Sequence, residues 1–241
     1  MTRAEVARVD VPKGEMVIRA RGVHHSFGQT SAVCDIDLDI YSGEIVALMG
    51  PSGAGKSTLL HLLAGVLAPD QGTIEYAGRT ISELSEAQRA QLRLNEFGFV
   101  FQFNQLLPDL SALDNVTIPL LLAGRSRRIA QRIARERLTL LGLSEDCDKL
   151  PAQLSGGQAQ RVAVARAMIT APRVLFADEP TGALDSLAAE RTMEAMTGLV
   201  RAAAATLVII THDARTAAYA DREVMIRDGR IAAAPTSEAH Q

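Results

Sequence analysis

Tryptophan is absent from this sequence of 241 residues, and cysteine occurs only twice, at Cys34 and Cys147. The two cysteines have neither the spacing of metal ligands nor a C-x-x-C pattern, which argues against a zinc site or a disulfide framework and favours a reducing cytoplasm. No apolar run approaches the ~20 residues that a membrane-spanning helix requires, and residues 1–15 lack the apolar core of a signal peptide. We therefore expect a soluble chain, whose action on a membrane would need a second, membrane-embedded chain.

The two signs of charge are nearly balanced, because 25 basic and 28 acidic residues leave a net charge of only −3. This balance gives no reason to expect a nucleic-acid partner. Apolar residues make up 47% and charged residues 22% of the chain, which is typical of a globular protein. We expect a flexible lead at 1–14, one domain over 15–234 and a disordered tail at 235–241.

A glycine-rich stretch at 50–58 stands between an apolar run at 45–49 and a helix-like run at 59–63. Its spacing is G-x-x-x-x-G-K-[ST], in which glycines let backbone N–H groups fold around phosphate oxygens while the next helix directs its positive end at the anion. In such a loop Lys56 reaches the β- and γ-phosphates, and the Ser57 hydroxyl ligates Mg²⁺. The stretch predicts nucleoside triphosphate binding. Its members are Gly50, Pro51, Ser52, Gly53, Ala54, Gly55, Lys56, Ser57 and Thr58.

An apolar run at 174–177, typical of a buried strand, ends in two adjacent carboxylates, Asp178 and Glu179. Two acids at the carboxyl end of a parallel strand, in a chain that also has a phosphate loop, indicate phosphoryl chemistry. We expect Asp178 to hold Mg²⁺ through water and Glu179 to polarise the attacking water as general base. The alternative is a capping Asp-Glu pair before a loop.

Residues 154–158, with the sequence Leu-Ser-Gly-Gly-Gln, are typical of a helix start capped by Ser155. The two glycines permit a nest of backbone N–H groups that binds anions. Because the stretch has no lysine of its own, it could only complete a phosphate site that is built mainly by something else.

The remaining pattern predicts an α/β fold. At 34–41 apolar residues alternate with aspartates, which indicates an antiparallel strand with one wet face. The middle of the chain, at about 88–165, is largely helical, and after residue 156 apolar β-rich runs alternate with helices, as in a parallel sheet covered on both faces. One helix, expected at 126–141, has an apolar stripe. The stripe consists of Ile129, Ile133, Ala134, Leu138 and Leu141.

Six ordered motifs closely resemble those of the ATP-binding cassette (ABC) ATPases, and the resemblance extends from about residue 16 to residue 234. They are the phosphate loop, Gln102, residues 154–158 followed by Arg161, residues 178–180, residues 183–185 and residues 211–213. The resemblance implies a P-loop NTPase with a RecA-like core, an N-terminal antiparallel β lobe and an inserted α-helical lobe at about 88–165. It also implies ATP hydrolysis with Mg²⁺.

The resemblance also assigns roles to single residues. Phe27 would stack on adenine, and Gln102 would contact Mg²⁺ and the attacking water. His212 would hydrogen-bond the γ-phosphate and help to position that water. Asp185 would lie at the contact with a second copy of the chain, whose ATP would be touched by the signature stretch. That stretch supplies Ser155, Gly156, Gly157 and Gln158. Since the chain has one phosphate loop and one signature, each ATP would be sandwiched between two copies.

Residues 97–122 closely resemble the subfamily of macrolide exporters, lipoprotein-releasing ATPases, haem exporters, peptide-antibiotic pumps and the cell-division ABC ATPase. The resemblance implies a separate four-helix permease with a large extracytoplasmic domain, docked near Phe103, Leu106 and Leu107, on the cytoplasmic face of the inner or cell membrane. The cargo would be hydrophobic or amphipathic: haem, a peptide antibiotic, a macrolide or a lipoprotein.

Two alternatives keep the ATPase but change its biological role. One is a division-type ATPase that controls a cell-wall hydrolase, and the other is a soluble ABC ATPase in chromosome maintenance or translation. The soluble kinds need long coiled coils or two cassettes, whereas this chain has one cassette and no sustained heptads between residues 102 and 155. Only the partner would identify a division-type protein.

Overall fold

The computed structural model describes residues 14–232. The tail expected at 235–241, and all but the last residue of the lead expected at 1–14, lie outside the described residues. The strands are β1 (Met16–Phe27), β2 (Thr30–Tyr41), β3 (Ile45–Met49), β4 (Gln71–Tyr76), β5 (Arg79–Thr80), β6 (Phe97–Phe101), β7 (Val174–Asp178), β8 (Thr206–Ile210), β9 (Arg222–Arg227) and β10 (Arg230–Ile231). The α-helices are α1 (Lys56–Leu63), α2 (Glu86–Glu96), α3 (Ala112–Leu122), α4 (Arg127–Leu140), α5 (Gly156–Met168), α6 (Ser186–Ala202) and α7 (Ala214–Ala217). Short 3₁₀ turns span Ser144–Asp146 and Pro151–Gln153. Among residues 14–232 no helix has both the length and the apolar character to cross a bilayer.

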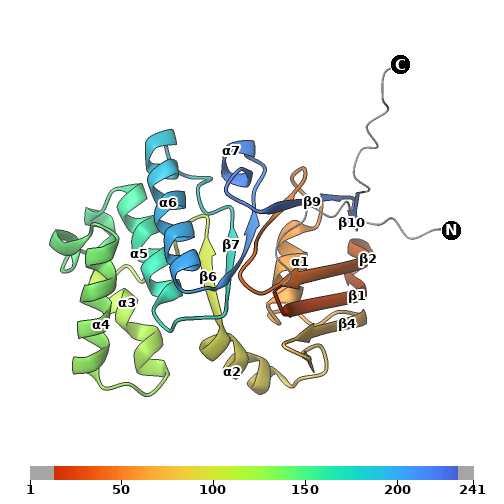
Figure 1. The fold of residues 1–241 in the computed structure, drawn as a ribbon, viewed down its shortest axis with the longest axis horizontal. Helices are drawn as coiled ribbons and strands as arrows, with labels where there is room; N and C mark the ends of the chain where they lie inside the picture. The colour runs from red at the N-terminus through yellow and green to blue at the C-terminus, as the bar shows by residue number, and fades with distance from the viewer. Residues whose placement is uncertain (1–13, 233–241) are drawn as a thin grey trace.

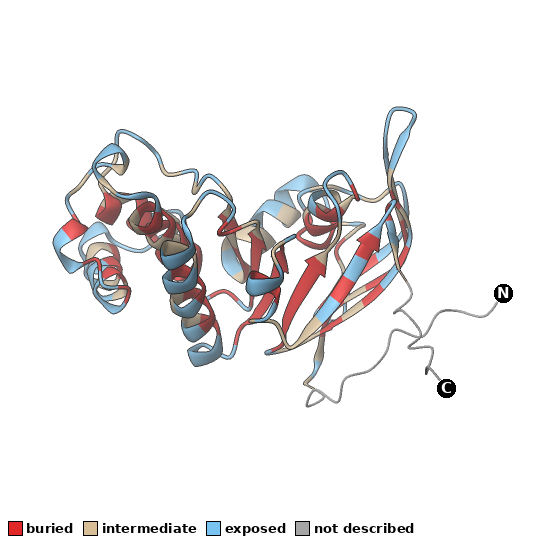
Figure 2. Cartoon of the chain, turned by 90° about the horizontal axis from the view of Figure 1, so that it is seen from above, coloured by how far each residue is buried: buried red, intermediate tan, exposed pale blue. Residues whose placement is uncertain are grey.

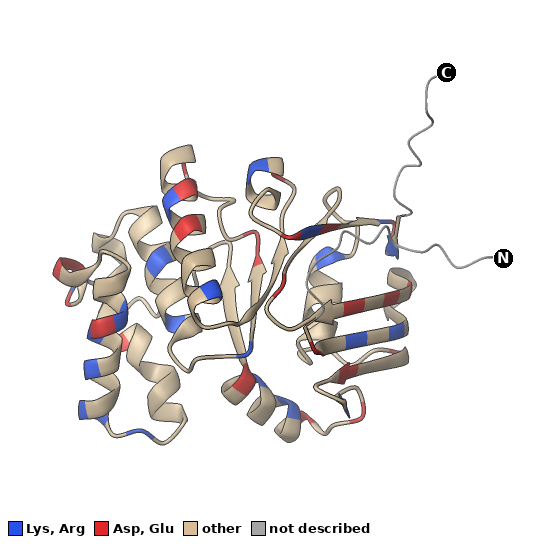
Figure 3. Ribbon diagram, in the orientation of Figure 1, with Lys and Arg blue, Asp and Glu red and all other residues tan. Residues whose placement is uncertain are grey.

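Four strands form an antiparallel sheet in the order β2-β1-β4-β5. The expected alternation on β2 is confirmed, since Ile36, Leu38 and Ile40 are buried while Asp35 and Asp37 are exposed. Acidic residues of β2 lie beside basic residues of β1 (Figure 3), and Arg21 of β1 forms an ion pair with Asp39 of β2 at 2.7 Å. The apolar face packs toward α1 in one buried cluster.

The second sheet has six strands in the order β10-β9-β3-β8-β7-β6, and all neighbours are parallel except β9 and β10. Successive side chains of β7 point to opposite faces of the sheet and pack in two different hydrophobic cores. Val174 and Phe176 pack in the cluster that contains α1 and the antiparallel sheet, and Leu175 and Ala177 pack in the cluster that contains α5 and α6. The expected parallel sheet with both faces covered is therefore confirmed (Figure 1), and buried positions concentrate on its strands (Figure 2).

The helical lobe is smaller than expected. Residues 97–101 lie within the predicted span of 88–165, but they form β6, which pairs with β7 from Phe97↔Val174 to Phe101↔Asp178. The lobe therefore begins after β6, and its core joins α3, α4 and α5. The predicted stripe on α4 is also shifted, because Ile129 is 44% exposed and Ala130 is buried in its place. Ala130, Ala134 and Leu138 follow one another at intervals of four residues, which places them on one face.

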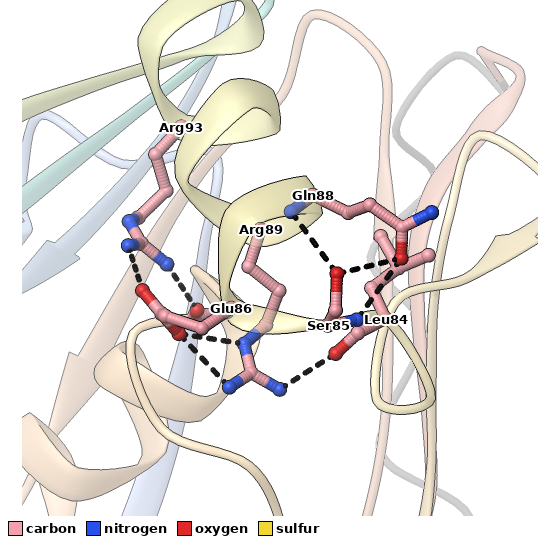
Figure 4. A network of polar contacts seen from close by, with 7 residues as sticks. Leu84, Ser85, Glu86, Gln88, Arg89 and Arg93 are labelled. Carbon is pink, nitrogen blue, oxygen red and sulfur yellow. Dashed lines mark hydrogen bonds and ion pairs between the residues drawn. The ribbon is translucent and has the colours of Figure 1, made fainter.

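None of the residues of helix α2 is fully buried, although Leu92 packs against the main core, and the start of the helix is capped. Ser85 Oγ accepts a hydrogen bond from the Gln88 N–H, and Gln88 Oε1 accepts one from the Ser85 N–H at 3.0 Å, which is a capping box. Hydrogen bonds from Arg93 and Arg89 hold the pKa of the Glu86 carboxyl below its usual value (Figure 4). Ser85 is therefore the N-cap at which α2 begins.

Candidate nucleotide-binding and hydrolysis site

Four parallel strands end in one row, and the motif residues follow that row. Leu48 of β3 pairs with Ile210 of β8, Ile210 pairs with Asp178 of β7, and Asp178 pairs with Phe101 of β6. The carboxyl edge of a parallel sheet is where such folds bind ligands. The residues that come one or two positions after the row are Gly50, Gln102, Glu179 and His212. The sheet order thus places four predicted site residues at one edge.

The phosphate loop requires glycine at two positions for steric reasons. A Cβ on Gly50, whose φ is +147°, would lie 2.0 Å from the Ile226 carbonyl oxygen, and a Cβ on Gly55, whose φ is +95°, would lie 2.1 Å from the Ala32 carbonyl oxygen. Gly55 is also the N-cap of α1 and offers no side-chain cap. The first N–H groups of α1 are therefore not satisfied by a side chain, and such groups at a helix N-terminus bind phosphate oxygens.

Lys56 lies over the same loop and is 6% exposed. Its ammonium donates hydrogen bonds to the carbonyl oxygens of Gly50, at 2.9 Å, and Pro51, at 2.8 Å. An ammonium group has three N–H donors, so one remains for a phosphate oxygen. Ser57, the next residue, is exposed, which leaves its hydroxyl accessible.

Glu179 and His212 are in direct contact, which the sequence did not predict. His212 Nδ1 lies 2.9 Å from Glu179 Oε1 and 2.9 Å from Oε2. Glu179 has a left-handed backbone with φ +46°, and its N–H donates to the Ile210 carbonyl oxygen at 3.0 Å. A non-glycine residue in this conformation stores strain, as often occurs at active sites. The contact orients both side chains at the edge of the sheet.

Gly182 belongs to the site, although sequence reasoning missed it. A Cβ at this position would lie 2.9 Å from Gln102 Nε2 and 3.3 Å from Glu179 Oε2. The Gln102 amide and the Glu179 carboxylate therefore both approach the Gly182 backbone. The feature of the sequence that marks this residue is its position, because a glycine stands three residues after Glu179 in the loop that follows the two carboxylates.

The predicted Ser-capped helix start at α5 is confirmed. Ser155 Oγ accepts from the Gln158 N–H at 3.2 Å, and Gln158 Oε1 accepts from the Ser155 N–H at 2.8 Å. Gln158 Nε2 also donates to Asp146 at 3.0 Å, so this side chain fixes the helix start within its own chain. A Cβ on Gly157 would lie 2.9 Å from Ala188 Cβ, which shows that α5 approaches the start of α6 closely. That start is capped by Asp185, which accepts from the Ala188 N–H at 2.9 Å.

Phe27, at the end of β1, is 56% exposed. Its ring meets the His25 ring edge-on with a centroid distance of 4.9 Å. His25 Nδ1 in turn lies 3.4 Å from Asp70 Oδ1. An exposed aromatic face that is held from one side provides a surface for stacking a flat ring.

A magnesium ion would have few protein ligands here. Within residues 14–232 no group of three or more His, Cys, Asp or Glu side chains could hold a metal ion. The three expected donors are Ser57, Gln102 and Asp178, which offer a hydroxyl, an amide and one carboxylate. Such a set fits Mg²⁺, which keeps several waters and binds through one or two carboxylates together with substrate phosphates.

Comparison with known proteins agrees with this geometry. A family model described as ABC transporter matches residues 33–182. A lipoprotein-releasing system ATP-binding protein, LolD 2, from Caulobacter vibrioides is 45% identical over 219 residues, which are 89% of this chain and 96% of the relative. The LolD protein of Syntrophotalea carbinolica is 48% identical over 196 residues, covering 81% and 86%.

Solved structures agree as well. The ATP-binding cassette MJ0796, in a dimeric post-hydrolysis state bound to ADP and Pi, superposes with a TM-score of 0.81 at 34% identity, covering 89% of this chain and 96% of that one. CbiO1 from Clostridium perfringens gives 0.82 at 28% identity, covering 90% and 87%. The family match spans the phosphate loop, Gln102, the signature stretch and the two carboxylates. This chain therefore belongs to the ABC transporter family, as an ATP-binding subunit that hydrolyses ATP.

Proposed function

We propose that two copies of this chain bind two Mg-ATP between them, head to tail, and drive a separate permease that extracts a lipid-anchored protein from a membrane. The lipoprotein class is favoured because relatives at up to 48% identity, over most of the chain, are named for lipoprotein release. Export of haem, a macrolide or a peptide antibiotic, and control of a cell-wall hydrolase, are the alternatives.

The observation that carries the composite site is the placement of α1 and α5. Helix α1, which begins at the phosphate loop, packs on one face of the six-stranded sheet, and α5, which begins at the signature stretch, packs on the other (Figure 1). This placement favours a signature that serves the ATP of a second copy rather than that of its own phosphate loop. The ATP-binding cassette MJ0796, solved as a dimer bound to ADP and Pi, supports a dimer as the working form.

Each residue at the sheet edge has a defined role in this proposal. Lys56 binds the β- and γ-phosphates, and the partner's signature N–H groups stabilise the charge that develops on the γ-phosphate. Glu179 accepts the proton of the attacking water, and its contact with His212 fixes the direction of the carboxylate. Bound Mg²⁺ would neutralise phosphate charge and would be held by Ser57, Gln102 and Asp178.

The surface beside Gln102 carries exposed apolar side chains, which supports a docking site for the permease there. Phe103 is 71% exposed and Leu107 is 47% exposed, whereas Leu106 packs against the core of the helical lobe. Exposed apolar side chains grouped in this way mark protein contacts. In the proposed complex this chain lies at the cytoplasmic face, bound to the permease through Phe103 and Leu107.

We expect Phe103→Glu and Leu107→Glu to reduce the permease recovered with a tagged chain from detergent-solubilised membranes to about a tenth, because a carboxylate in an apolar contact is not solvated. Stoichiometric partners are identified by mass spectrometry. Leu122→Glu is the control, since Leu122 is 67% exposed at the far end of α3. Equal recovery with all three variants would refute the docking site. Recovery of soluble partners alone would contradict the transport function.

A further inference from the structure

The loop between β6 and α3 has an unusual backbone conformation near its start. Asn104 and Gln105, two and three positions after Gln102, have left-handed backbones with φ of +40° and +48°. Two consecutive non-glycine residues of this kind are energetically unfavourable unless the surrounding structure holds them.

One side chain from α5 holds both residues. Arg166 donates a hydrogen bond at 2.7 Å to the Gln105 carbonyl oxygen and another at 2.7 Å to the Asn104 carbonyl oxygen. The planar guanidinium presents two N–H groups in a fixed fork, which suits two adjacent carbonyl oxygens. Burial lowers the pKa of Arg166 from its ordinary value, but a guanidinium remains charged at neutral pH. A charged donor in shielded surroundings makes a strong hydrogen bond.

The other end of the same segment is also fixed by α5. Gln160, which is 1% exposed, donates from Nε2 to the Phe101 carbonyl oxygen at 2.9 Å. Gln102 and Phe103 therefore lie between two attachments to a single helix, at Phe101 on one side and at Asn104 and Gln105 on the other. That helix begins at the signature stretch, so the loop and the signature are tied to one rigid element.

We propose that Arg166 is a positioning residue for hydrolysis, which holds the Gln102 amide in place beside Glu179. The inference rests on the proposed role of Gln102. Arg166 touches neither nucleotide nor water in this proposal. Arg166 acts through the backbone: without its hydrogen bonds to the two carbonyl oxygens, Asn104 and Gln105 would relax from the left-handed conformation and Gln102 would move. Small displacements of an orienting group lower turnover strongly.

The test is a double-mutant cycle on the purified chain with ATP and Mg²⁺. We expect Arg166→Ala and Arg166→Lys each to lower kcat about tenfold with the KM for ATP changed less than about twofold, because the phosphate loop is on other elements. Both should raise the Mg²⁺ concentration needed for half-maximal activity. Gln102→Ala should likewise lower kcat and raise the Mg²⁺ concentration needed for half-maximal activity. The kcat of the double variant Gln102→Ala/Arg166→Ala should be no lower than that of Gln102→Ala alone.

The lysine variant keeps the charge and most of the volume, so it remains informative if the alanine variant folds poorly. Arg132→Lys on α4 is the matched control, since Arg132 is exposed and bonds Glu136. Effects of Gln102 and Arg166 that multiply in the double variant would overturn the inference, as would Arg166→Lys with wild-type kcat and Mg²⁺ dependence. A Gln102→Ala variant with normal kcat would instead show that the proposed role of Gln102 is wrong.

Discussion

Glu179→Gln is expected to lower the turnover of ATP by about 10²- to 10³-fold while ATP binding is retained, because an amide keeps the shape of the carboxylate but cannot accept the proton of the attacking water. The contact with His212 can persist in the variant, so the loop after β7 should keep its position. Single-turnover hydrolysis and filter binding of labelled ATP measure the two quantities separately. The bound, unhydrolysed nucleotide should also keep two copies together.

The matched control for this experiment is the substitution Glu194→Gln. Glu194 is an exposed residue on α6, so its replacement should leave both ATP turnover and ATP binding unchanged. Wild-type hydrolysis by the Glu179→Gln variant would exclude the general-base role. Loss of ATP binding together with turnover would point to a structural role for the Glu179 carboxylate instead.

Gly55→Ala is expected to weaken ATP binding about a hundredfold, which corresponds to about 2.7 kcal/mol. The added methyl group would lie 2.1 Å from the Ala32 carbonyl oxygen of β2, and this neighbour is backbone that cannot rotate away. The start of α1 would have to move, and with it the N–H groups that bind phosphate. Titration with a fluorescent ATP analogue measures the affinity, and thermal unfolding measures the accompanying loss of stability.

Gly53→Ala separates the clash from the loss of backbone freedom. Gly53 has a φ of +78°, also left-handed, but a Cβ there would meet no atom within 4 Å. In the Gly53→Ala variant ATP binding should therefore weaken by no more than the backbone strain, which is about 1–2 kcal/mol. Equal affinities for the two variants would mean that the contact with Ala32 does not shape the phosphate site.

The local parts of the site could be predicted from the sequence because each is encoded by neighbours in the chain. The spacing from Gly50 to Ser57 predicts a strand, a loop and a helix, and Ser155 with Gln158 predicts a capped helix. These stretches need no knowledge of the rest of the fold, because capping and glycine-rich turns depend on residues one to five positions apart.

The contacts that required the structure depend on the order of strands in the sheet. Glu179 follows β7 and His212 follows β8. These two strands are neighbours because the sheet has the order β3-β8-β7. Periodicity predicts strands but not their order. The same limit explains why the span predicted for the helical lobe includes β6: a short aromatic run beside helices gives no sign of its pairing with β7. Exposure also had to be observed, since it distinguishes Phe103 from Leu106.

Mixing two inactive variants tests most directly whether the site is shared between two copies. Lys56→Ala removes the phosphate loop's cation and leaves the signature, and Ser155→Arg obstructs the signature and leaves the phosphate loop. A mixed dimer contains one complete site, built from the unaltered parts of both chains. Equal mixing should therefore restore about a quarter of the wild-type rate, because half of randomly assorted dimers are mixed and each has one of two sites complete. A mixture no more active than the sum of its two components would contradict a composite site.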